Sequence, residues 1–112
     1  MNDVTAAPGA DQGDASKPDG PLEFKLSKPI LSFGKQIDTL TLRKPTGADL
    51  IRIGNPVIFT PHVDPPRVEH DMARVIAMVA KLSGVPSTSL ETLDPADLVG
   101  LAWAISPFFM PA

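Results

Sequence analysis

The sequence predicts an α+β fold, in which an N-terminal β-hairpin or small antiparallel sheet packs on two to four short helices behind a disordered tail. Three observations support this prediction. Apolar and polar side chains alternate from residue 22, as in half-buried strands. Helix-start signals and long apolar runs follow from residue 46. The 112 residues have room for one domain, which we place at residues 21–107.

Both ends of the chain differ from this domain in composition. Residues 1–20 are rich in Ala, Gly, Pro, Asp and Ser and have almost no large apolar side chain. Such a segment cannot bury enough surface to offset the entropy lost on ordering. Its four Asp and one Lys account for the whole net charge of -3. We therefore predict a disordered acidic tail at 1–20, and an apolar C-terminal tail at 108–112.

The first structured segment is predicted to be a β-hairpin. The alternating pattern is interrupted at Pro29 and then resumes, a turn is expected at residues 34–36, and a second strand follows at 37–42. Because a lone hairpin is only marginally stable in water, these strands must pair further or pack on helices. The apolar residues of this pattern are Leu22, Phe24, Leu26, Ile37, Leu40 and Leu42.

A short helix is expected after the hairpin. Thr46 is a favourable N-cap, and Asp49 in the first turn favours the helix dipole. Asn55 and Pro56 end this helix. The segment 55–66 contains four prolines and is predicted to be an extended loop that is solvated or faces a partner.

Two further helices and a single helical turn are predicted in the second half. One helix covers roughly Pro66 to Ser83 and is closed by Gly84. A single turn follows around residues 87–93. Asp94 then caps a last helix with Pro95 at its first position, and this helix ends at residues 106–107.

An anion site is one interpretation of the basic pair Arg43 and Lys44. They precede a helix start, where free N–H groups near Thr46 could hold a phosphate or carboxylate. Against this, Pro45 removes one donor and no glycine-rich run or Walker pattern follows. We favour ordinary strand-end charges, one of which points to solvent.

A metal site is similarly disfavoured. The segments 62–64 and 69–71 supply two histidines and three carboxylates. On the predicted helix, however, His70 shares a face with Arg74 and Lys81, and this cationic surrounding opposes a divalent ion. We interpret these residues as a solvated face and expect no metal and no cofactor.

The sequence does not favour an enzyme. Neither histidine lies near a glycine-rich nucleophile elbow, and there is no cysteine or tyrosine. Asp94 and Asp97 are better explained as helix caps than as an acid/base pair. The chain after residue 20 is neutral, which disfavours nucleic-acid binding, and it lacks an apolar run of the ~18–20 residues that would span a membrane.

The most informative feature is an excess of apolar surface. Residues 75–80 and 98–105 are apolar nearly all round, although one apolar stripe suffices for a surface helix. Either these helices bury each other, or a second face binds a partner. Two adjacent aromatics past Pro107 are hard to bury in one core, so a partner is favoured there. The predicted partner-binding residues are Met72, Val75, Ile76, Val79, Leu98, Leu101, Trp103, Phe108 and Phe109.

Two motifs are similar to those of a known family. "LTLRKPTGADL" at 40–50 and "AKLSGVPSTSLETLDPADLVGL" at 80–101 resemble the small tail assembly chaperones of contractile-tailed, Mu-like bacteriophages. The matching positions are Arg43, Pro45, Asp49, Leu82, Gly84, Val85, Pro86, Leu90, Leu93, Asp94, Asp97 and Leu98.

The resemblance implies a non-enzymatic assembly factor that acts in the host cytoplasm. It would bind the tape-measure protein and keep it soluble until the tail tube assembles around it, and it would also bind further copies of itself. The alternative is a small structural or oligomerising module of a tail or other assembly, with no separate client.

Overall fold

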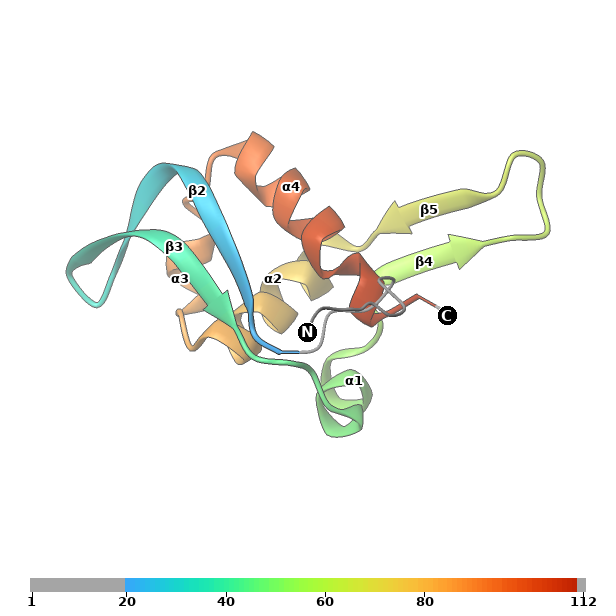
Figure 1. Cartoon of the computed structure of the whole chain (residues 1–112), viewed down its shortest axis with the longest axis horizontal. Coiled ribbons are helices and arrows are strands. Elements are labelled where there is room, and N and C mark those ends of the chain that lie inside the picture. The colour runs from blue at the N-terminus through green and yellow to red at the C-terminus, as the bar shows by residue number, and fades with distance from the viewer. Residues whose placement is uncertain (1–19, 111–112) are drawn as a thin grey trace, which may run out of the picture.

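In the computed structural model, residues 20–110 are described, and they form two small antiparallel sheets and four α-helices (Figure 1). The predicted α+β fold is therefore confirmed. The predicted disordered tail falls almost wholly on residues 1–19, which lie outside the described residues, as do residues 111–112.

The predicted first hairpin is present. Strand β2 (Leu22–Ser32) pairs antiparallel with β3 (Lys35–Leu42). The turn lies at Phe33 and Gly34, so the prediction of 34–36 was one residue late. Both turn residues have positive φ, at 52° and 78°, which is the requirement of a type I′ turn.

A β-bulge interrupts the pairing of this hairpin. Lys25 pairs with Thr39 and Ile30 with Ile37, so residues 26–29 stand against the single residue between those partners. The extra residues cannot all join the ladder and leave N–H groups without a strand partner. Two of these N–H groups, those of Ser27 and Lys28, donate hydrogen bonds to the Asp97 carboxylate of a helix.

The segment 55–71 differs from the prediction. Helix α1 (Gly47–Ile53) is present, but β4 (Val57–Thr60) and β5 (Arg67–His70) replace the predicted loop and form a second antiparallel hairpin. Three of the four prolines lie in the connection and the fourth precedes β4, so none removes a ladder hydrogen bond.

The next helix also begins later than predicted. Helix α2 spans Met72–Ser83 rather than starting at Pro66, because the chain before it is paired in β5. Asp71 is its N-cap and accepts a bond from the Arg74 N–H. As predicted, Gly84 ends the helix in the left-handed conformation.

The C-terminal elements follow the prediction. Helix α3 (Ser87–Leu90) is a single turn, and α4 (Pro95–Ile105) has Asp94 as N-cap and a proline in its first turn. A short 3₁₀ helix, η1 (Ser106–Phe108), continues from α4.

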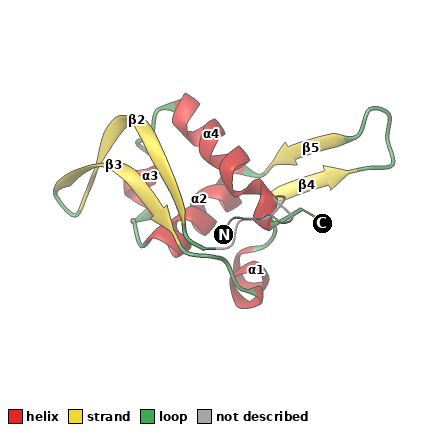
Figure 2. Cartoon of the chain, in the orientation of Figure 1, coloured by secondary structure: helices red, strands yellow, loops and turns green. Residues whose placement is uncertain are grey.

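The core lies between the first hairpin and the helices. The β2–β3 hairpin covers α2, α3 and α4 on one side, whereas β4–β5 extends away from the helices (Figure 2). Gly100 allows α4 to approach β2 closely, since a Cβ there would meet the Phe24 ring at 3.3 Å. The buried apolar residues of the core are Leu26, Ile30, Leu40, Leu42, Val75, Met78, Val79, Leu82, Leu90, Leu93, Leu101, Ala102 and Ile105.

Candidate functional site

The basic pair at the end of β3 binds a carboxylate of the chain itself. The Arg43 guanidinium donates to both oxygens of Asp49, at 2.8 and 3.1 Å. The same carboxylate accepts from the Thr46 backbone N–H, which completes the capping box of α1. The Arg43 side chain, followed by this N–H, holds the pKa of Asp49 below its ordinary value. Arg43 is thus used to fix the start of α1, and Lys44 is exposed.

The acidic pair of α4 has two different structural roles. Asp94 caps the helix, as predicted. Asp97 instead accepts hydrogen bonds from the backbone N–H groups of Ser27 and Lys28, at 3.0 and 3.2 Å, inside the β-bulge. The Ser27 N–H is the main reason that the pKa of Asp97 lies below its ordinary value. Asp97 therefore joins α4 to β2.

His70 lies in β5 and not on a helix, so the prediction that it shares a helix face with Arg74 and Lys81 was wrong. Its Nε2 lies 2.8 Å from Ser106 Oγ. The Ser106 hydroxyl already donates to the Ala102 carbonyl, so it must accept from a His70 Nε2–H. Burial lowers the pKa of His70. The His70 ring thus joins the second hairpin to the end of α4.

Residues 20–110 lack both a metal-ion cluster and a membrane-spanning helix. No three His, Cys, Asp and Glu side chains gather there as a metal-ion site. In the same part of the chain, no helix is long and apolar enough to cross a membrane.

The predicted partner-binding residues divide by burial. Val75, Val79 and Leu101 lie in the core and are 0% exposed. The other six are half-buried or exposed, and only these can contact a partner while the domain stays folded. Their role in binding remains a prediction. They are Met72, Ile76, Leu98, Trp103, Phe108 and Phe109.

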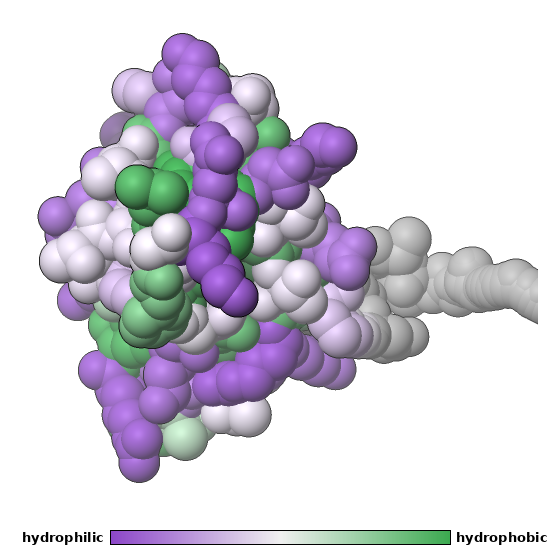
Figure 3. Space-filling model, turned by 90° about the vertical axis from the view of Figure 1, so that its left-hand side faces the viewer, coloured by the Kyte–Doolittle hydropathy of each residue, from purple (hydrophilic) through white to green (hydrophobic). Residues whose placement is uncertain are grey.

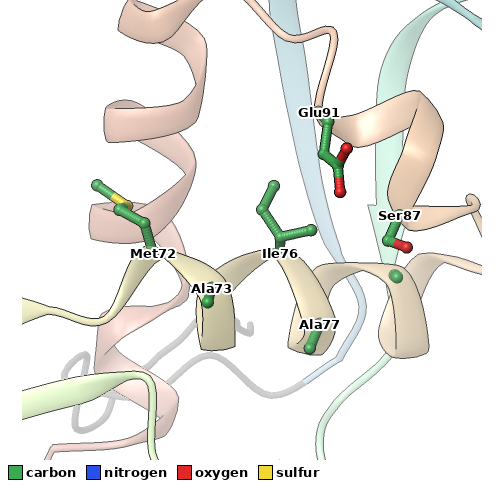
Figure 4. A pocket seen from close by; sticks show the side chains of 7 residues that line it. Met72, Ala73, Ile76, Ala77, Ser87 and Glu91 are labelled. Atoms are coloured by element: carbon green, nitrogen blue, oxygen red, sulfur yellow. The ribbon is translucent and has the colours of Figure 1, made fainter.

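The first exposed apolar feature is the α2–α3 groove, which encloses about 640 Å³. Met72, Ala73, Ile76 and Ala77 line it from successive turns of α2, and Glu91 stands opposite at the end of α3 (Figure 4). Ala80 and Ser87 complete its lining. The groove is a mainly apolar face of α2 that the other described elements leave open.

The second feature is the aromatic groove, which lies between α1, β4 and the C-terminal segment. It encloses about 610 Å³. Phe108 and Phe109 meet edge to face in it, with ring centroids 6.3 Å apart. On one side of the groove, the Asn55 side-chain amide donates a hydrogen bond to the Phe109 carbonyl at 3.4 Å. Its apolar lining consists of Leu50, Val57, Phe59, Pro61, Phe108, Phe109 and Met110.

The third feature is the hairpin tip, which we define as Leu31 and Phe33. Their exposed fractions are 63% and 82%. Figure 3 faces the side toward which β2–β3 points, and apolar side chains interrupt the hydrophilic surface there. Sequence reasoning missed both residues, although a phenylalanine directly before a turn glycine was a usable signal. It also missed Ile51 on α1, which is 85% exposed.

Comparison with known proteins matches most of the chain to a protein family. The family model described as "Phage tail assembly chaperone proteins, E, or 41 or 14" matches residues 23–110. No curated protein and no solved structure matches the chain.

Proposed function

Because this chain belongs to the phage tail assembly chaperone family, we propose that it binds the tape-measure protein of its phage and keeps it soluble until the tail tube assembles around it. The family suggests a protein client and a non-enzymatic role. We place this action in the host cytoplasm, where tail proteins are synthesised.

The observation that supports this proposal is the open apolar face of α2. A helix on the surface of a small domain needs one apolar stripe, and the buried Val75, Met78 and Val79 already provide it. The α2–α3 groove adds a second apolar face, which costs solubility unless a partner covers it.

The shape of the groove favours a helical client. Ala73, Ala77 and Ala80 are small and lie on neighbouring turns of α2, so the axis of a second helix can approach closely. An amphipathic client helix would place its apolar stripe between Met72 and Ile76, as in other helix-in-groove complexes. Glu91 at the edge of the groove would then favour a Lys or Arg beside that stripe.

The experiment is co-expression of this chain with the tape-measure protein, followed by affinity capture. In the Ala77→Glu variant, a charged side chain enters the groove from an exposed position, so the fold is retained and we expect client capture to fall at least ~10-fold. Ala48→Glu is the matched control, because Ala48 is also exposed on a helix but lies on α1, away from the groove.

Capture that is equal for both variants would contradict binding through this groove. If the wild-type chain captures no client and elutes as a fixed oligomer, the alternative of a structural or oligomerising module with no separate client is favoured.

A further inference from the structure

Phe33 occupies a position that the fold alone does not explain. A type I′ turn requires positive φ at both central residues, and Asn, Asp or Gly normally occupy them. Phe33 has φ of 52°, a conformation that is unfavourable for a bulky side chain. Its ring is 82% exposed, so this strain is not offset by burial. Strained residues of this kind are concentrated at functional positions.

The aromatic groove lies on the other side of the molecule. Figure 1 shows the β2–β3 turn and the β4–β5 connection pointing away from each other on opposite sides of the helices. The groove adjoins β4, and its half-buried aromatics Phe108 and Phe109 remain accessible. A tip and a groove placed in this way cannot meet within one molecule.

The charges beside the two features have opposite signs. Lys35 follows the turn glycine and is exposed, and among the described residues it makes no ion pair. Asp64 is exposed in the β4–β5 connection, three residues beyond Pro61 of the groove lining, and is likewise unpaired in residues 20–110. The lysine beside the apolar tip is thus complementary in charge to a carboxylate of the hairpin that lines the groove.

We propose that the hairpin tip of one copy inserts into the aromatic groove of a second copy, with Phe33 against Phe108 and Phe109 and with Lys35 near Asp64. This contact is heterologous, because it joins two different surfaces. In a pair, one copy therefore still presents a free groove and the other a free tip, and the contact repeats into an open head-to-tail row.

The inference goes beyond the proposed function, since it requires no client. The two side chains of the tip bury much less than the ~800 Å² per partner of a standard interface, so the contact is weak and reversible. Along a long client, linked copies would bind more tightly than single ones. In the absence of a client, the contact is best detected by covalent trapping.

The chain contains no cysteine, so a crosslink between two introduced cysteines shows that these two positions lie close together. The Lys35→Cys, Asp64→Cys double variant, treated with a short bismaleimide, should give a ladder of dimers, trimers and higher oligomers. Adding Phe33→Asn should reduce the ladder at least ~10-fold, because asparagine suits the turn but lacks the ring. The control pair is Lys35→Cys with Arg52→Cys, since Arg52 is exposed on α1 and does not line the groove.

A mixing experiment tests the direction of the contact. Chains with Lys35→Cys alone, mixed with chains carrying both Asp64→Cys and Phe33→Asn, retain one intact tip and one intact groove and should form a crosslinked heterodimer. With Phe33→Asn moved to the Lys35→Cys chain, the heterodimer should be lost. Equal yields in both mixtures, or a yield no higher than that of the Arg52→Cys control, would overturn the proposal.

Discussion

The two hairpins follow the same two-stranded plan but are fixed to the helices in different ways. β2–β3 buries four apolar side chains in the core, and Asp97 binds its bulge. In β4–β5, Val57 is the one buried apolar side chain. The second hairpin is joined to α4 through His70, which bonds Ser106 and packs edge-on against Trp103 with ring centroids 4.7 Å apart.

This difference shows how a small domain can expose apolar surface without losing its fold. The first hairpin is fixed so firmly along its length that its tip can tolerate a strained and exposed phenylalanine. The second hairpin adds little to the core, so its apolar side chains remain available beside the aromatic groove. Regions with few buried apolar contacts unfold locally most readily, and binding surfaces often lie in such regions.

The largest expected effect is on the core of the first hairpin. Leu40 is 1% exposed, so Leu40→Ala should lower the free energy of unfolding by about 2–5 kcal/mol. Ile58 of the second hairpin is 45% exposed, and Ile58→Ala should cost less than about 1 kcal/mol. Urea denaturation of both variants measures the contrast. Similar losses at the two positions would show that the hairpins contribute equally.

The next effect concerns the bulge. Asp97→Asn replaces one acceptor oxygen with a donor that cannot bond a backbone N–H, which should cost about 1–3 kcal/mol. The pKa of Asp97 is lower in the folded chain, so its contribution is present above the ordinary pKa of ~3.9 and is lost as the pH falls below it.

The measurement is urea denaturation of wild type and Asp97→Asn between about pH 3 and pH 7. The variant should lose less stability on acidification than wild type. Asp38→Asn is the control, because this exposed carboxylate is bonded by the neighbouring Thr39 hydroxyl. An acid dependence that Asp97→Asn leaves unchanged would contradict the role of this carboxylate.

A smaller and local effect is expected where the second hairpin joins α4. Ser106→Ala removes the acceptor of the His70 N–H and should cost about 0.5–1.5 kcal/mol. Hydrogen exchange should show faster exchange of the β4–β5 amides, with those of β2–β3 unchanged. Ser87→Ala, at an exposed serine of α3, should change neither hairpin. Uniformly faster exchange would mean that the second hairpin opens only with the whole domain.

The smallest effect has the opposite sign. Phe33→Asn places a residue that favours positive φ in the turn, so it should raise the free energy of unfolding by about 0.5–1 kcal/mol. Thermal denaturation measures the change. A clear loss of stability would mean that the exposed ring stabilises the hairpin and that its retention needs no partner.

Elements with local signals could be predicted from the sequence. Thr46 and Asp94 mark the starts of α1 and α4, Gly84 marks the end of α2, and alternation from residue 22 marks β2. The second hairpin could not be predicted in this way. Its prolines indicated a loop, and its two strands, Val57–Thr60 and Arg67–His70, have four residues each and are too short to show a clear alternating pattern.

The candidate surfaces could be predicted only in part. Periodicity identifies Val75 and Ile76 as apolar helix positions, but tertiary packing decides that the first is buried and the second lines a groove. The aromatic groove depends on how the C-terminal segment meets β4, which no local pattern encodes. Asp97 could not be assigned from the sequence for the same reason. Its position in the first turn of α4 predicts a helix-capping role and does not indicate its hydrogen bonds to β2.

The proposed function requires that the α2–α3 groove keeps a helical client soluble. It is tested most directly by measuring how much of the tape-measure protein remains in the supernatant after expression alone, with wild type, and with Ala77→Glu. We expect a soluble client with wild type and an aggregated client in the other two cases. A client that is equally soluble in all three, or equally protected by Ala77→Glu, would contradict it.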